Sequence, residues 1–205
     1  RLSYEPFETL RSGESATIYS AWRGAGLFDR AFPDVAGRTD EDVKVLKEVD
    51  RAAARGARLD DSTLIGAFYL FPFYREFAEL TGDGRKHDNV EMLRRVAVML
   101  EPAATNLRLS NHTHHLLMQG LFTLTKMNRA PDRGRKVLKL ARQEYFRVAW
   151  ALFQLAGAAG LVPTDALQGW SAAVLRLDKT NDKAGSEEGR SKPKRRRRPR
   201  RRRRR

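Results

Sequence analysis

The stretch DSTLIGAFYLFPFYREFAEL, residues 61–80, decides the fold class of this chain. Leu64, Phe68 and Phe71 recur at helical spacing, so the stretch is most simply interpreted as a buried central helix. Pro72 has no backbone N–H and is expected to kink that helix. A helix that is buried in the centre of a fold needs further helices or a sheet around it, and the flanking sequence indicates which.

Helical periodicity continues on both sides of this stretch. Upstream, residues 39–56 have Thr39 as the expected N-cap, acids in the first turn and Gly56 as the expected C-terminal end. Downstream, helices are predicted at residues 89–100, 110–127, 143–160 and 163–178. No strand pattern of period two and no Asn-Gly hairpin signal appears. The sequence therefore predicts an all-α fold, a bundle or irregular array of helices.

The positive charge is concentrated at the C-terminus. Of the 40 Lys and Arg residues, 13 lie within residues 190–205, which contain no acid; the rest of the chain holds the other 27 and all 25 acids, a net charge of +2. The segment after Asp178 has lost its apolar residues, so residues 179–205 are predicted to be a disordered linker and an arginine-rich tail. The tail is expected to bind RNA phosphates through Arg195, Arg196, Arg197, Arg198, Arg200 and Arg201.

Composition excludes several classes of protein. The absence of cysteine excludes disulfides, thiolate zinc sites and cysteine nucleophiles, and it fits a reducing cytosol. No signal peptide is apparent, and the longest apolar stretch, residues 148–162, is shorter than the roughly 20 residues of a membrane span. We therefore expect a cytoplasmic protein without a membrane partner. Because the sequence begins with Arg1 and not Met, we also expect a processed or excised chain.

Residues 40–42, Asp-Glu-Asp, contain a spacing that holds metal ions in some phosphoryl-transfer enzymes. On a helix, however, side chains at i and i+2 diverge by about 200°. Acids are also favoured in the first turn of a helix by its dipole. We interpret this triplet, and the pair Asp60-Asp61, as helix starts.

Three histidines, His112, His114 and His115, form the second candidate for a metal site. Only His112 and His115 are helical neighbours, and zinc would need further ligands that the sequence does not supply nearby. A solvated or RNA-facing helix is the preferred interpretation. Residues 82–88, GDGRKHD, lack the context of a phosphate loop and predict a turn between helices. The sequence predicts no catalytic residue and no metal ligand.

An internal basic segment, residues 126–147, carries eight cations, followed by aromatic residues. Cations interleaved with aromatic rings suit a phosphate backbone and stacked bases. For Phe146, Trp150 and Phe153 we prefer a place in the core, and for the cations RNA contact and a solvated face are equally open. The predicted RNA-binding residues of this segment are Lys126, Arg129, Arg133, Arg135 and Lys136.

Residues 1–35 resemble the neck-to-body junction of bacterial poly(A) polymerases, which belong to the class II nucleotidyltransferase superfamily together with the CCA-adding enzymes. The marks are an Arg-Leu pair that opens a helix, a helix that ends at Gly26, and the pairs Leu27-Phe28 and Phe32-Pro33. Gly26 can supply a left-handed C-cap, after which Leu27 and Phe28 fold back on the helix. Pro33 can terminate the helical structure at this point.

The resemblance continues in order along the chain. LIGAFYLFPFYREF, residues 64–77, is similar to the central body helix of the family, and residues 126–155 are similar to its basic loop and the Phe-Arg-x-Ala helix after that loop. The tail is similar to the arginine-rich C-terminus that distinguishes the poly(A) polymerases from their CCA-adding relatives. The resemblance implies three parts: the end of the neck (1–33), an RNA-binding helical body (34–178) and the linker and tail (179–205).

The head domain of the family, with its Gly-Ser turn and paired aspartates, has no counterpart in this sequence. The resemblance therefore implies the part of the enzyme that holds RNA 3′ ends, with Mg²⁺ and ATP as cofactors of the intact parent and none for this chain alone, which we expect to be inactive by itself. Two alternatives stay open: a non-enzymatic RNA- or ribosome-associated helical protein with a basic anchoring tail, and a CCA-adding relative, against which the tail argues.

Overall fold

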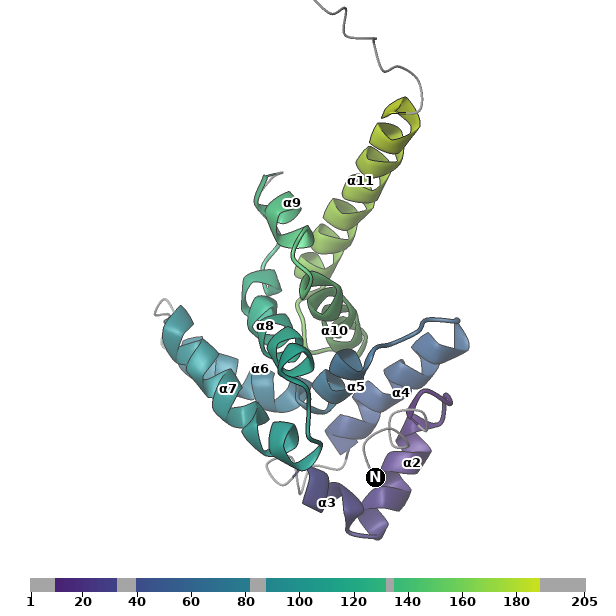
Figure 1. Cartoon of the computed structure of the whole chain (residues 1–205), viewed down its shortest axis with the longest axis vertical. Helices are drawn as coiled ribbons and strands as arrows, with labels where there is room; N and C mark the ends of the chain where they lie inside the picture. The colour runs from purple at the N-terminus through teal and green to yellow at the C-terminus, as the bar shows by residue number, and fades with distance from the viewer. Residues whose placement is uncertain (1–9, 33–39, 82–87, 132–134, 189–205) are drawn as a thin grey trace, which may run out of the picture.

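The computed structural model of this chain describes residues 10–32, 40–81, 88–131 and 135–188. Within these ranges every regular element is an α-helix, which confirms the predicted fold class (Figure 1). The helices are α2 (Ser15–Gly24), α3 (Leu27–Ala31), α4 (Asp40–Ala54), α5 (Asp61–Phe68), α6 (Leu70–Thr81), α7 (Asn89–Asn106), α8 (Asn111–Met127), α9 (Arg135–Ala141), α10 (Phe146–Ala158) and α11 (Thr164–Glu188). None of them is both long enough and apolar enough to cross a membrane.

The centre of the array is formed by α5, α8 and α10, which pack against one another. Small residues permit the close approach of these helices. A Cβ atom added to Gly120 of α8 would lie 2.9 Å from Cγ1 of Val148 on α10, and one added to Gly66 of α5 would lie 2.8 Å from Cδ1 of Leu152. In Figure 1, α7 flanks this centre on one side, α2 to α4 lie at one end of the molecule, and α9 and α11 lie at the other.

The stretch 61–80 forms two helices instead of one kinked helix. The break falls at Tyr69, between α5 and α6, and Pro72 lies in the first turn of α6. A proline ring clashes with the carbonyl group four residues earlier, which here belongs to Phe68, the last residue of α5. The sequence predicts a kink at Pro72 within one helix; the structure has instead a break between two helices, about one turn earlier. The prediction of burial is correct for Leu64 and Phe68, which are at most 2% exposed, whereas Phe71 is only half-buried.

The junction at the N-terminal end has the left-handed residue that was predicted. Gly26 has φ +67°, and α3 begins at the next residue. Phe28 is buried, and its ring meets that of Tyr19 on α2 edge to face, with 4.7 Å between the centroids. Leu27, in contrast, is 53% exposed, so the prediction that both residues fold back on α2 is correct for Phe28 and wrong for Leu27.

Several predicted helix ends can be compared with the structure. Gly56 ends α4 with φ +80°, and the backbone N–H of Ala57 donates to the carbonyl oxygen of Ala52 at 3.0 Å, as in a Schellman motif. Asp60 caps α5, because its carboxylate accepts from the backbone N–H of Thr63 at 2.8 Å. Thr39, Pro33 and residues 82–87 lie outside the described residues.

Two segments contain more helix than the sequence predicts. The basic loop includes α9, and α11 continues to Glu188, ten residues beyond Asp178, where the predicted helix ends. Residues 179–188 contain good helix formers and no proline. Once α11 is nucleated, each added residue gains one backbone hydrogen bond, so a helix can continue without an apolar face.

Candidate nucleic-acid interface

The basic segment runs from the last turn of α8 through α9 to the start of α10. Lys126 is exposed on α8, and its ammonium group lies 4.9 Å from the centroid of the Phe122 ring, within the range of a cation–π contact. Arg129 is exposed in the connection after α8. The structure therefore exposes to solvent both members of the predicted RNA-binding set whose side chains are described.

The connection after α8 is held against α11. The indole Nε1 of Trp170, a residue that is only 4% exposed, donates to the carbonyl oxygen of Arg129 at 2.9 Å. The backbone of α11 also comes close, because a Cβ added to Gly169 would lie 3.1 Å from both Ala130 and Pro131. The position of Arg129 is thus fixed by a residue 41 positions further along the chain.

Four exposed cations of this region lie within residues 126–142, and they share one property with several exposed cations elsewhere, such as Arg30, Arg58 and Arg75. Within the described part of the chain, none of the four forms an ion pair, and we refer to them as the α8–α9 cations: Lys126, Arg129, Lys139 and Arg142. Elsewhere carboxylates neutralise arginines in the pairs Arg11–Asp61, Arg51–Glu48, Arg94–Glu91, Arg95–Glu76 and Arg147–Asp60. The α8–α9 cations therefore keep their full charge for an external anion.

The remaining predicted RNA-binding residues are not placed in the same detail. Arg135 and Lys136 open α9, where the backbone alone is described. Arg133 and the tail residues Arg195, Arg196, Arg197, Arg198, Arg200 and Arg201 lie outside the described residues. The members of the predicted set that lie within the described residues are thus found at the end of α8, just after it, and at the start of α9.

The aromatic residues of the segment belong to the core, as preferred from the sequence. Phe146 and Phe153 are buried, and Trp150 is half-buried between them. The ring planes of Phe146 and Trp150 are inclined by 11°, with 6.5 Å between their centroids. Tyr145 is half-buried against the same core. Because these rings pack on one another, this segment has exposed cations but few ring faces that are free to stack on a ligand.

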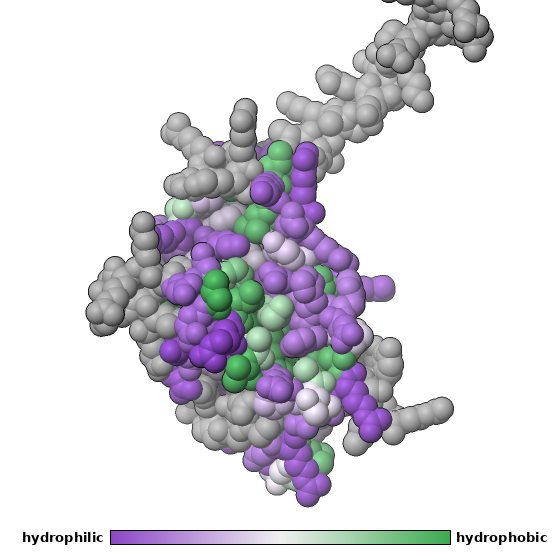
Figure 2. Space-filling view, turned by 60° about the vertical axis from the view of Figure 1, so that its left-hand side comes forward, coloured by the Kyte–Doolittle hydropathy of each residue, from purple (hydrophilic) through white to green (hydrophobic). Residues whose placement is uncertain are grey.

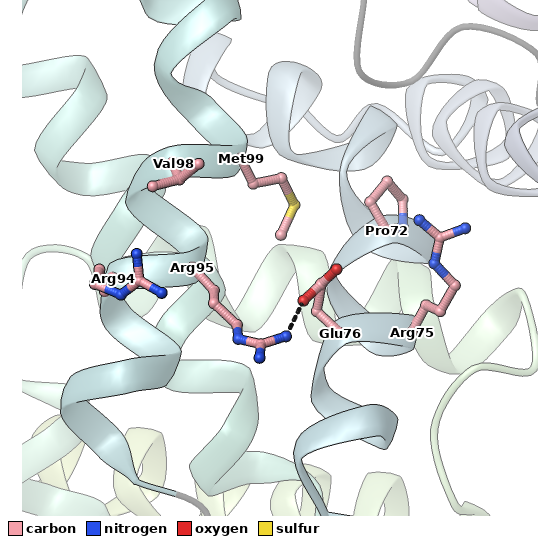
Figure 3. Close-up of a pocket in the computed structure, with 7 residues that line it drawn as sticks. All are labelled: Pro72, Arg75, Glu76, Arg94, Arg95, Val98 and Met99. Atoms are coloured by element: carbon pink, nitrogen blue, oxygen red, sulfur yellow. Dashed lines mark hydrogen bonds and ion pairs between the residues drawn. The ribbon is translucent and has the colours of Figure 1, made fainter.

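A small groove of about 240 Å³ lies between α6 and α7 (Figure 3). Arg95 of α7 donates to Glu76 of α6 at 2.7 Å, and Glu91 accepts from both Arg94 and Arg95. These two guanidinium groups lower the pKa of Glu91 to about 2. Figure 2, in which the α7 side of the molecule is turned forward, shows hydrophobic surface bordered by hydrophilic side chains; Val98, 56% exposed, is one of the apolar residues at this groove.

A larger groove, of about 680 Å³, lies where the end of α4, the α4–α5 turn and the start of α10 meet the N-terminal segment. We call it the α4–α10 groove. Its charged lining residues are Arg11, Arg58, Asp60 and Arg147, and its apolar ones include Leu10, Val49, Ala53, Leu59 and Leu64. No sequence pattern identifies this groove, because its arginines come from three segments that are up to 136 positions apart.

The described acids of the triplet and the histidines have contacts that suit a structural role. Asp40 opens α4, as expected of a helix start, whereas Asp42 is only 2% exposed and accepts from the Tyr19 hydroxyl at 2.7 Å. Burial and the nearby Asp42 carboxylate raise the pKa of Tyr19. His112 lies 3.4 Å from Glu144, from Nε2 to Oε1. Among the described residues, no group of three or more histidines, aspartates or glutamates is close enough to hold a metal ion.

A comparison of the chain with protein-family models, curated proteins and solved structures finds no match. Its chemistry is therefore inferred from the described side chains. They define an all-α protein with exposed, unpaired cations at residues 126–142 and a wide groove lined by arginines and apolar residues.

Proposed function

We propose that this chain is the RNA-binding C-terminal part of a poly(A) polymerase, which holds the 3′ end of an RNA while a head domain outside this sequence adds AMP. The observation that carries the proposal is the set of α8–α9 cations, which are exposed and have no ion-pair partner among the described residues. Four unneutralised charges in one region release condensed counterions when they bind a phosphate backbone. That free energy favours a polyanion over a small neutral ligand.

The position of α11 supports the same assignment. In Figure 1, α9 lies beside α11, and α11 extends away from the other helices at this end of the molecule. In the sequence, the arginine-rich residues 190–205 come directly after α11. The α8–α9 cations and the chain segment that leads to the tail thus share one end of the body. An RNA strand held by the α8–α9 cations lies on the side from which the tail is attached.

The junction and the body also support the resemblance to this family. Gly26 adopts the left-handed conformation, Phe28 packs on α2, and the apolar stretch at residues 64–77 is largely buried. The Phe-Arg-x-Ala residues open α10 with Phe146 and Ala149 in the core and Arg147 outside. These local features suit a neck that ends on a helical body.

The test measures RNA affinity by fluorescence anisotropy with a labelled 15-nucleotide oligoadenylate at several salt concentrations. In a chain that ends at residue 189, alanine replaces all four α8–α9 cations. Each phosphate contact with a single strand contributes about 0.7 to the slope of log affinity against log salt, so the slope should fall by about 3. A matched control replaces four other exposed cations without an ion pair among the described residues: Arg30, Lys44, Lys47 and Arg75.

We expect a much smaller change of slope in the control, with unchanged helicity in both variants by circular dichroism. Equal slopes for the wild-type chain and the variant of the α8–α9 cations would show that these residues only face solvent.

A second measurement addresses the missing head: the whole chain, given RNA, ATP and Mg²⁺, should incorporate no AMP, because phosphoryl transfer requires metal ions held by carboxylates. Adenylation by this chain would contradict its assignment as body and tail.

A further inference from the structure

The α4–α10 groove combines cations with an apolar wall. Arg147 is 78% exposed and lies 3.0 Å from Asp60, from Nη2 to Oδ2. Arg58 is exposed and forms no ion pair among the described residues. Arg11 is held by the α4–α5 turn and the start of α5. Its Nε donates to the carbonyl oxygen of Leu59 at 3.1 Å, and its guanidinium group pairs with Asp61. Of the three arginines, Arg58 and Arg147 are therefore the more available to an external anion.

The apolar side of the groove comes from separate segments. Val49 and Leu64 line it but are at most 2% exposed, so the accessible apolar surface comes from Ala53 on α4 and from Ala57 and Leu59 in the α4–α5 turn. The volume of about 680 Å³ lies in the range of sites for small molecules and nucleotides, which are mostly apolar with a few polar groups that orient the ligand. A flat heterocycle can cover such a wall, and a phosphate attached to it reaches the arginines.

We propose that the α4–α10 groove binds one nucleotide unit of a single RNA strand, with its phosphate at Arg58 and Arg147 and its base against the accessible apolar wall of Ala53, Ala57 and Leu59. This inference rests on the proposed RNA-binding function and adds a second contact to it. Among the described lining residues three arginines stand against a single acid, Asp60, so the groove carries an excess of positive charge that suits an anionic ligand. Charge complementarity and the apolar wall together select a phosphodiester with its base.

The groove is connected to the α8–α9 cations through the chain itself. Arg142, the last of these cations, stands five residues before Arg147, which lines the groove at the first turn of α10. A strand that leaves the α8–α9 cations can therefore continue across the start of α10 into the groove. Along this path the pair Arg147–Asp60 is the element that a phosphate must rearrange, because Arg147 changes its partner from the carboxylate to the phosphate.

The experiment uses the whole chain and the labelled 15-nucleotide oligoadenylate. The variant Arg58→Ala/Arg147→Ala should bind at least about fivefold more weakly at 0.1 M salt, and its salt slope should fall by about 1.4, or 0.7 for each lost phosphate contact. The control Arg75→Ala/Arg94→Ala matches it, since one arginine has no ion pair among the described residues and the other is paired with a carboxylate, but it lies at the α6–α7 groove. The control should change the affinity less than twofold.

A second variant tests the apolar wall without a change of charge. Ala53→Leu fills the groove from α4 with a residue that suits a helix, so affinity should fall while the salt slope stays constant. The variant Arg58→Lys/Arg147→Lys should restore the slope, because a lysine also neutralises a phosphate. Thermal melts within about 2 °C of the wild type show that each variant is folded.

The outcomes separate this inference from the proposed function. If the wild-type chain binds RNA but the groove variants bind as tightly as the control, the inference is overturned and the proposed function stands. That result would leave a segment of the chain itself, or a protein partner, as the occupant of the groove. If the wild-type chain does not bind the oligoadenylate, both fail. If Ala53→Leu weakens RNA binding as much as Arg58→Ala/Arg147→Ala does, the result supports the placement of a base against the apolar wall of the groove.

Discussion

Tyr74 of α6 carries a buried hydroxyl group that has no hydrogen-bond partner among the described residues. Such a group loses its hydrogen bonds to water on folding and gains none in return. We predict that Tyr74→Phe stabilises the protein by about 1 kcal/mol at neutral pH, which corresponds to a rise of a few degrees in Tm. A melt monitored by circular dichroism measures the change.

The effect of Tyr74→Phe should grow at high pH. Burial raises the pKa of Tyr74 above its ordinary value of 10, so the unfolded chain loses this proton first. The free energy of unfolding of the wild type is therefore unaffected by this ionisation below about pH 10 and falls as the pH rises above it. The difference in Tm between variant and wild type should widen from pH 9 to pH 11. A constant difference over this range would show that Tyr74 titrates as it does in the unfolded chain.

At the scale of elements, the connection between α8 and α9 depends on one hydrogen bond from α11. Trp170→Phe keeps an aromatic ring in place but removes the indole N–H that donates to the Arg129 carbonyl oxygen. We predict a loss of about 1 kcal/mol of stability, with faster cleavage by trypsin after Lys126 and Arg129. Both residues are exposed, so cleavage is limited by how firmly the connection is held.

The control for this prediction is Trp150→Phe. Trp150 is half-buried in the same region, and no described residue accepts a hydrogen bond from its indole N–H. The Trp150→Phe variant should lose some packing of the ring but show the same rate of cleavage at Arg129 as the wild type. Equal cleavage rates in the two variants would mean that the ring of Trp170, and not its hydrogen bond, holds the connection.

At the scale of the whole molecule, the tail is expected to increase affinity without contributing to the fold. Residues 190–205 hold 13 cations and no acid, so their sequence offers little apolar surface for a core and their charges repel one another. If about half of them bind a single strand at once, they add roughly 4 to 5 to the salt slope. Deletion of these residues should flatten the slope by that amount and leave the melt of the body nearly unchanged.

A chain in which serine replaces the 13 cations is the control for length. It should behave like the deletion, because the contribution comes from charge and carries no sequence information. If the deletion changes neither the affinity nor its salt dependence, the tail binds something other than RNA, with a protein receptor as the first alternative. A large fall in Tm would show that residues 190–205 contribute to the fold.

The elements were largely predictable from the sequence. Helical spacing, a distortion near Pro72, the end of α4 at Gly56 and the start of α5 at Asp60 depend on residues within one or two turns of each other, where backbone geometry alone decides. For the same reason the burial of Phe146 and Phe153 was predictable from their spacing. The continuation of α11 to Glu188 was not predicted, because a polar sequence suggests a linker although its residues can extend an existing helix.

The candidate site was predictable only in part. The sequence by itself determined that cations are frequent in residues 126–147 and in the tail, since each is one continuous segment of the chain. Only the tertiary structure decided which of the described cations are left without carboxylate partners, and that Arg11, Arg58 and Arg147 line one groove. The physical reason is distance along the chain: periodicity relates a residue to its neighbours within a few turns, whereas pairs such as Arg147–Asp60 or Trp170–Arg129 exist only because whole helices pack together.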